Sequence, residues 1–86
     1  MILEDKLFGR KYRIKVEEHQ YLLQKKYTSE KGEDYWDNLG YYTTLSGALK
    51  KMIRIRVLAA RTVKNLEDYV SRYEQIHRQL QKRFDF

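Results

Sequence analysis

The first half of the chain alternates between apolar and polar side chains, which is the period of a half-buried β-strand. The clearest example is KYRIKV at residues 11–16, where one face is apolar and the other carries only basic side chains. Polar turns at 17–20 and 29–33 separate the alternating stretches, and Gly32 in the second turn is able to take a positive φ. The pattern predicts three strands, over about residues 10–17, 20–28 and 34–42.

From residue 44 onward, apolar side chains recur at steps of three and four, which is the period of an amphipathic helix. Thr43, Thr44 and Ser46 are candidate capping residues for a first helix. Asn65, with an acidic side chain in the turn that follows, is typical of the start of a second helix. We therefore expect two helices, over about residues 45–62 and 66–84. A single unbroken helix over 45–84 is the alternative, because no Gly or Pro marks the end of the first.

These elements predict one α+β domain over residues 1–86, in which a three-stranded antiparallel sheet is followed by two helices and the first helix packs on the sheet. In the third strand, simple alternation places Trp36 and Tyr42 on one face and Tyr35 and Tyr41 on the other. A chain of 86 residues buries only a modest core, so a homodimer through the last helix is one expectation. The apolar stripe of that helix consists of Leu66, Tyr69, Val70, Tyr73, Ile76, Leu80 and Phe84.

Charge is distributed unevenly along the chain. The formal net charge is +6, and basic and acidic side chains cancel outside residues 44–64. That segment contains no Asp or Glu, and a helix face of one sign favours an acidic partner such as nucleic acid or an acidic protein. Arg56 falls within the apolar stripe of this helix. The candidate binding residues are therefore Lys50, Lys51, Arg54, Arg61 and Lys64. A solvated basic face without a partner, or an amphipathic helix on a membrane surface, are the alternatives.

Aromatic side chains are the second candidate feature. The sequence holds eight Tyr and one Trp, and most of them fall in the expected strands. Such rings contribute large contact areas in recognition surfaces and stack on nucleic-acid bases, although they also build small cores. We consider Trp36 and Tyr42 candidate binding residues. Basic side chains on the outer face of the sheet would act with them, namely Lys11, Arg13, Lys15 and Lys26.

The sequence gives little support for catalysis. It has no cysteine, which excludes disulfides and thiolate metal sites, and its only histidines are His19 and His77. No combination of Ser, His and acid suggests a nucleophile, so we expect no enzyme and no cofactor. Glu33, Asp34 and Asp37 offer oxygen ligands for a hard cation, but their spacing matches no calcium loop. We expect a solvated turn there and no metal.

The chain has no expected membrane segment. Its longest purely apolar run is Val57–Ala60, far short of the roughly 20 residues that span a bilayer. Acidic residues directly follow Leu3, so we expect no signal peptide. The absence of cysteine is compatible with a reducing compartment, and we expect a cytoplasmic protein.

Two resemblances follow from short motifs. The order of three strands and a helix, with YWDNLGYYTTLSGAL at the junction, resembles the apetala-two type of DNA-binding domain. By rough position, this resemblance implies that side chains of the sheet read the major groove, namely Arg13, Lys15, Lys26 and Trp36. The chain lacks that family's Arg-rich first turn and adds a second long helix.

Over nearly its whole length the chain is similar to small proteins encoded by phages and prophages of Gram-positive bacteria. The likeness lies in the KYRI-like first strand at residues 11–14, the GYY-like third strand at 40–42 and the two helices. Some proteins of this kind are anti-CRISPR inhibitors, so the resemblance implies a small protein that regulates transcription or blocks a host defence.

The leading hypothesis is a non-enzymatic phage-type inhibitor in the host bacterial cell. It would dock its basic helix and aromatic residues on a nucleoprotein such as an RNA-guided nuclease. The first alternative is direct binding to duplex DNA or RNA, by the sheet or by the basic helix. The second is a structural module that forms a homodimer through its last helix.

Overall fold

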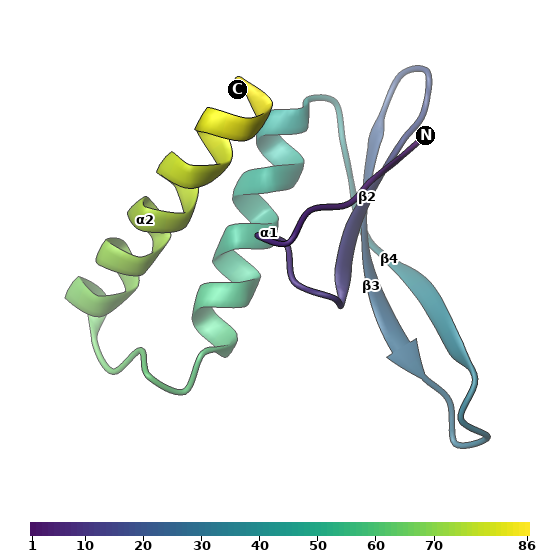
Figure 1. The fold of residues 1–86 in the computed structure, drawn as a ribbon, viewed down its shortest axis with the longest axis horizontal. Helices are drawn as coiled ribbons and strands as arrows, with labels where there is room; N and C mark the ends of the chain where they lie inside the picture. Colours follow the sequence, from purple (N-terminus) through teal and green to yellow (C-terminus); the bar gives the residue numbers. More distant parts are fainter.

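The computed structural model describes residues 1–86 as a sheet with two helices on one side of it (Figure 1). The strands lie in the order β1-β2-β3-β4, and each is antiparallel to its neighbour. The α+β class and the two separate helices are confirmed, but the sheet has four strands where three were expected. The elements are β1 (Ile2–Leu3), β2 (Tyr12–Val16), β3 (Tyr21–Thr28), β4 (Asp34–Tyr42), α1 (Leu45–Ala59) and α2 (Leu66–Phe84).

The additional strand, β1, is the N-terminal edge of the sheet. Ile2 lies opposite Lys15 and Leu3 opposite Ile14. The carbonyl of Met1 also accepts a hydrogen bond from the Val16 amide at 2.8 Å. A strand of two residues is too short to show an alternating pattern, which is why the sequence did not indicate it.

A β-bulge at Leu39 changes which side chains of β4 share a face. Leu23 lies opposite Gly40, whereas Gln24, the next residue of β3, lies opposite Asn38, so Leu39 has no partner on β3. One extra residue reverses the alternation beyond it. Trp36 therefore faces away from the helices and Tyr42 faces toward them. The expectation that these two rings share a face is wrong, because simple alternation assumes an unbroken ladder.

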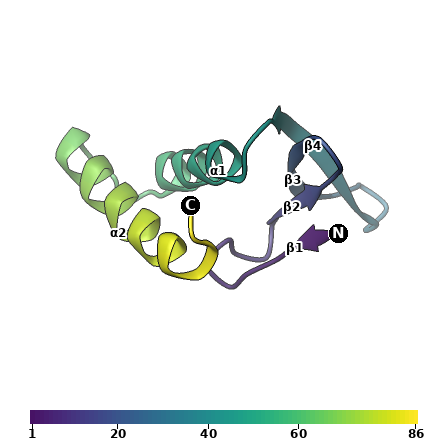
Figure 2. The ribbon, with the colours of Figure 1, turned by 90° about the horizontal axis from the view of Figure 1, so that it is seen from above.

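The core lies between the inner face of the sheet and α1. Helix α1 also lies between the sheet and α2 (Figure 2). The helix starts as expected, because the Thr44 hydroxyl accepts a hydrogen bond from the Gly47 amide at 3.0 Å. Nine side chains form the main buried cluster, namely Phe8, Ile14, Leu23, Ala48, Leu49, Met52, Ile53, Val57 and Leu80.

Helix α1 ends at Ala59, three residues earlier than expected, because Ala60 adopts an extended backbone. Arg61 and Lys64 consequently lie in the connection between the helices and not on α1. The second helix has the expected start, since the Asn65 side chain accepts a hydrogen bond from the Asp68 amide at 2.8 Å. This cap and the break before it exclude the single unbroken helix.

The loop between β1 and β2 joins the sheet to both helices. Phe8 is fully buried and its ring stacks on Phe84 with the ring centres 5.5 Å apart. The Arg56 guanidinium donates a hydrogen bond to the carbonyl of Leu7. Gly9 has a φ of 81°, which favours glycine, and the Arg56 guanidinium lies close beside it. This loop therefore anchors the C-terminal end of α2 and the last turn of α1 together.

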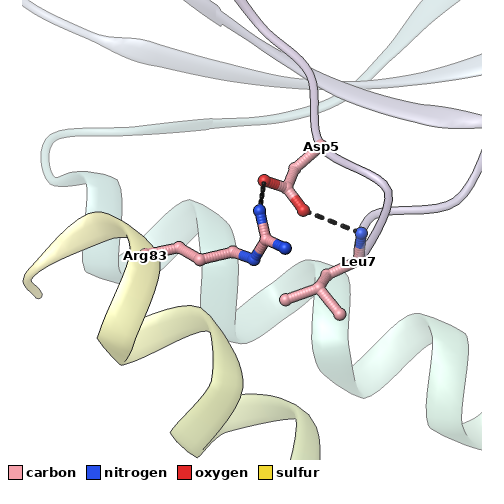
Figure 3. Close-up of polar contacts among 3 residues, drawn as sticks. All are labelled: Asp5, Leu7 and Arg83. Carbon is pink, nitrogen blue, oxygen red and sulfur yellow. Dashed lines mark hydrogen bonds and ion pairs between the residues drawn. The ribbon is translucent and has the colours of Figure 1, made fainter.

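A carboxylate completes this anchor (Figure 3). Asp5 accepts a hydrogen bond from the Leu7 amide at 2.9 Å and pairs with the Arg83 guanidinium at 3.0 Å. Along α2, Leu80 is fully buried, whereas Leu66 is 75% exposed. The second helix is thus held mainly by its C-terminal half, whereas Tyr69 and Tyr73 in its N-terminal half are only partly buried against the core.

The first prediction compares the two ends of α2. Leu80→Ala should lower the free energy of unfolding by about 2–5 kcal/mol, because it leaves a cavity in the core. Leu66→Ala, the same substitution in the same helix, should change it by less than about 0.5 kcal/mol. Urea denaturation followed by circular dichroism measures both. Equal effects would show that the N-terminal half of α2 is packed as tightly as the C-terminal half.

Candidate functional site

A groove lies between α1, the connection after it and the N-terminal half of α2. Its volume is about 970 Å³. It lies where α2, which is anchored at its far end, separates from α1 toward the connection (Figure 1). We call this feature the interhelical groove. Its lining consists of Lys50, Lys51, Arg54 and Leu58 from α1, Val63, Lys64 and Asn65 from the connection, and Leu66, Tyr69, Val70, Tyr73 and Glu74 from α2.

The two walls of the groove differ in chemistry because each helix presents a different face. On α1, Lys51, Arg54 and Leu58 are three and four residues apart, so they follow one another along one side of the helix. On α2, all lining residues except Glu74 belong to the expected apolar stripe. Leu66 and Val70 are 75% and 43% exposed and lie four residues apart, so they form an exposed apolar row on this wall. The α1 wall is therefore mainly cationic and the α2 wall mainly apolar.

The structure brings together four of the five cations expected in the basic segment. Lys50, Lys51, Arg54 and Lys64 line the groove, are exposed, and have no carboxylate partner. Arg61 is exposed in the connection but does not line the groove. The groove therefore concentrates positive charge that the protein itself leaves unpaired.

One carboxylate and two phenols complete the groove. Glu74 is paired with Arg78 at 3.8 Å, one turn along the same helix. Burial, and to a smaller extent the neighbouring Tyr69, raises the pKa of the Tyr73 hydroxyl. That hydroxyl stays protonated at neutral pH and is able to donate a hydrogen bond to an acceptor in the groove.

The sequence did not indicate the apolar wall as part of a site. Leu66, Tyr69, Val70 and Tyr73 were expected to pack against the domain or a second copy, as members of one continuous stripe. No sequence signal indicated this, because the expected helices over residues 45–62 and 66–84 were of nearly equal length, and only the structure shows that α1 ends at Ala59. The angle between the helices, which opens the groove, follows from the anchoring loop and is not visible in the pattern of α2.

The outer face of the sheet is a second, separate surface. The Arg13 guanidinium lies over the Trp36 ring, 4.1 Å from its centre. Arg13 also donates a hydrogen bond to Gln24 at 2.7 Å, and Gln24 donates one to Asn38 at 2.9 Å. These contacts fix the guanidinium against the ring in a row of polar side chains that crosses β2, β3 and β4.

The other cations expected on the sheet differ in whether a carboxylate already pairs with them. Lys15 lies on the outer face and Lys11 at the start of β2, and both are exposed. Lys26 is paired with Asp34 at 3.3 Å. Tyr42 does not belong to this surface, because it lies on the inner face and packs against the core. The sheet face therefore combines Arg13, Lys15, Lys26 and Trp36, but not Tyr42.

The acidic turn does not form a metal site in this structure. No group of three or more metal-ligating side chains comes together anywhere in the chain. The Thr28 hydroxyl donates a hydrogen bond to Asp34 at 2.7 Å. This hydrogen bond, with Lys26 beside it, lowers the pKa of the Asp34 carboxyl. The Asp34 carboxylate is thus already in contact with Thr28 and Lys26, where β3 and β4 meet at the turn.

Comparison with protein-family models, with curated proteins and with solved structures finds no match to this chain. Neither helix has the length and apolar character needed to cross a bilayer. Function therefore has to be inferred from the chemistry of the interhelical groove and of the outer sheet face.

The second prediction concerns pH. Because the pKa of Asp34 is lowered on folding, its carboxylate stabilises the protein above the unfolded-state pKa, and this contribution is lost as the pH falls through the folded value. Thr28→Val removes the largest cause and should raise the pKa of Asp34 toward its ordinary value, as measured by carboxyl ¹³C NMR titration. Ser29→Ala, in the same turn, should leave it unchanged because Ser29 contacts Glu33 instead. An unchanged pKa in Thr28→Val would contradict this assignment.

The third prediction uses Trp36, the only tryptophan, as a reporter of the outer sheet face. Arg13→Ala uncovers the ring to water, so the Trp36 fluorescence maximum should move to longer wavelength. Arg54→Ala, an exposed arginine on α1, should leave the emission unchanged. Identical spectra for the two variants would mean that the guanidinium does not cover the ring in solution.

Proposed function

We propose that this protein is a non-enzymatic, phage-type inhibitor that docks its interhelical groove on a host defence nucleoprotein in the bacterial cytoplasm, in the manner of an anti-CRISPR protein. The observation that supports docking is the groove itself, which places unpaired cations beside exposed apolar side chains. The nucleoprotein target, for which an RNA-guided nuclease is the model, is supported by the resemblance of residues 11–14 and 40–42 to phage proteins.

The composition of the groove favours a protein surface over bare phosphates. Phosphate neutralisation needs cations and no apolar contact. Interfaces between proteins, in contrast, take most of their binding energy from a few buried aromatic and apolar side chains within a polar rim. Tyr69, Val70 and Tyr73 would supply such a centre, and the lysines of α1 would supply the rim.

Nucleic-acid binding by the outer sheet face is the second candidate function. The stack of Arg13 on Trp36 supports it, because a flat π-surface next to exposed lysines is suited to bases and phosphates. The charge on this face is weaker than in the groove, since Lys26 is already paired with Asp34. We therefore rank this function below docking through the groove.

The fourth prediction tests docking. Lys50→Glu with Arg54→Glu should abolish inhibition of DNA cleavage by the targeted RNA-guided nuclease, because it reverses the charge of the α1 wall and leaves the core untouched. Lys11→Glu with Lys15→Glu is the matched control, with the same charge change on the sheet, and should still inhibit. Circular dichroism confirms that both variants are folded. If the wild-type protein neither binds nor inhibits any member of a panel of RNA-guided nucleases, this target class is wrong.

Fluorescence polarisation with labelled duplex DNA, duplex RNA and single strands separates the two candidates. Docking predicts little affinity for free nucleic acid at physiological salt and unchanged Trp36 emission. Binding by the sheet predicts quenching of Trp36 and, if about four phosphates are neutralised, a loss of affinity on the order of a hundredfold between about 50 and 200 mM salt. The second result would replace the docking proposal with direct nucleic-acid binding.

A further inference from the structure

We infer that the occupant of the interhelical groove is an α-helix of the partner protein that carries an apolar stripe bordered along one side by Asp and Glu. This inference rests on the proposed docking role of the groove, and it does not depend on the identity of the target. It follows from the chemistry of the two walls, from the size of the groove and from the charge that the protein leaves unpaired.

The two walls define the two sides of the occupant. The α2 wall offers Leu66, Val70 and Tyr73, which lie three and four residues apart and form a row of apolar contacts. The α1 wall offers Lys51 and Arg54 in a parallel row. An occupant therefore needs apolar side chains toward α2 and carboxylates toward α1. A helix presents such an arrangement when apolar residues recur at i, i+3, i+4 and i+7 and acids flank them on one side.

The dimensions of the groove agree with a helix. From Leu66 to Tyr73 the α2 wall extends over two turns, or about 11 Å. Two turns of a helix about 10–12 Å wide occupy roughly 900–1,200 Å³. The groove measures about 970 Å³. It is therefore able to hold about two turns of an occupant whose ends continue beyond it, with Lys64 at the closed end next to the connection.

Charge argues against a second copy of this chain as the occupant. A two-fold symmetric interface brings the same patch of both copies together. Each patch contributes four cations, and the only lining carboxylate, Glu74, is already paired with Arg78. Like charges placed opposite one another oppose association. A homodimer that uses the half of the α2 apolar stripe lining the groove is thus disfavoured.

Shape argues against a bilayer surface. Leu58 and Leu66 are 60% and 75% exposed, but they lie on opposite walls of a concave feature. A flat membrane surface would meet only the outward parts of the two walls and would leave the space between them unfilled. An amphipathic helix fills the groove and covers both walls at once, which is why we choose it as the occupant.

The fifth prediction uses display libraries of 16-residue, helix-forming peptides with the full-length protein as bait. Three libraries share an apolar stripe and carry Glu, Gln or Lys on its flank, and a fourth carries the same Glu content with the apolar residues dispersed. We expect recovery from the striped Glu library alone. The recovered peptides should bind at least tenfold more tightly than their Gln versions in fluorescence polarisation, and this advantage should shrink as salt rises.

Variants locate the binding site. Leu58→Glu with Leu66→Glu should weaken the recovered peptides at least tenfold, by adding carboxylates and removing apolar contact on both walls. Both positions are exposed, so the fold should persist. Tyr41→Glu, on the outer sheet face and 64% exposed, is the matched control and should bind as the wild type does. Amide chemical shifts from ¹⁵N-labelled protein should change along both walls of the groove.

Several results would overturn the inference. The first is that the Lys library or the dispersed library yields binders as readily as the striped Glu library does. The second is that no library yields binders, and the third is that Tyr41→Glu loses binding. A dimer in sedimentation equilibrium, or binding to vesicles containing phosphatidylserine, would also overturn it if the groove double variant abolished the association.

The inference and the proposed function fail separately. If striped Glu peptides bind the groove but no RNA-guided nuclease is inhibited, the occupant is correct and the target class is wrong. If a nuclease is inhibited equally well by the Leu58→Glu, Leu66→Glu variant, the protein is an inhibitor that docks through another surface, and the inference about the groove is wrong.

Discussion

The fold depends on the burial of Phe8, which the loop between β1 and β2 places between the sheet and the two helices. Complete burial of such a ring contributes about 1.5–3 kcal/mol, a large share of the stability of a small domain. The polar contacts around it determine its position, because Arg56 holds the Leu7 carbonyl and Arg83 holds Asp5. Without this loop, α2 would have only α1 to pack against, and its position relative to the sheet would not be fixed.

The same anchor explains where the protein leaves a surface open. It buries the apolar side chains at the C-terminal end of α2 and leaves those at the N-terminal end exposed, beside cations that have no carboxylate partner. An exposed apolar row is unfavourable for an isolated chain, and neighbouring cations repel one another, so an acidic, partly apolar partner that covers them relieves both effects. The interhelical groove and the outer sheet face share no residue, so the two candidate functions depend on different parts of the sequence.

Local signals in the sequence were sufficient for most elements. The caps at Thr44 and Asn65 and the two periodicities predicted both helices and three of the four strands, because these signals depend on neighbouring residues alone. The two-residue β1 and the bulge at Leu39 were missed, since each is decided by pairing with distant residues. The early end of α1 was missed because no Gly or Pro marks it in the sequence. For the candidate site, four cations of the basic segment were found from charge alone. Their apolar partners on α2 were not, because only the tertiary arrangement shows which part of the stripe stays uncovered.

Because α2 is held mainly at its C-terminal end, a rotation at that end would displace its N-terminal end. Leu80 marks its fixed end, and Leu66 lies fourteen residues away, or about 21 Å along the axis. A rotation of about 10° at the fixed end would displace the free end by about 4 Å, which follows from that length. Such a movement equals the difference between a small and a bulky side chain in the partner. Such a rotation would change the width of the groove next to the connection, where Leu66 is 75% exposed and lies outside the core, and would let the groove fit occupants of unequal size.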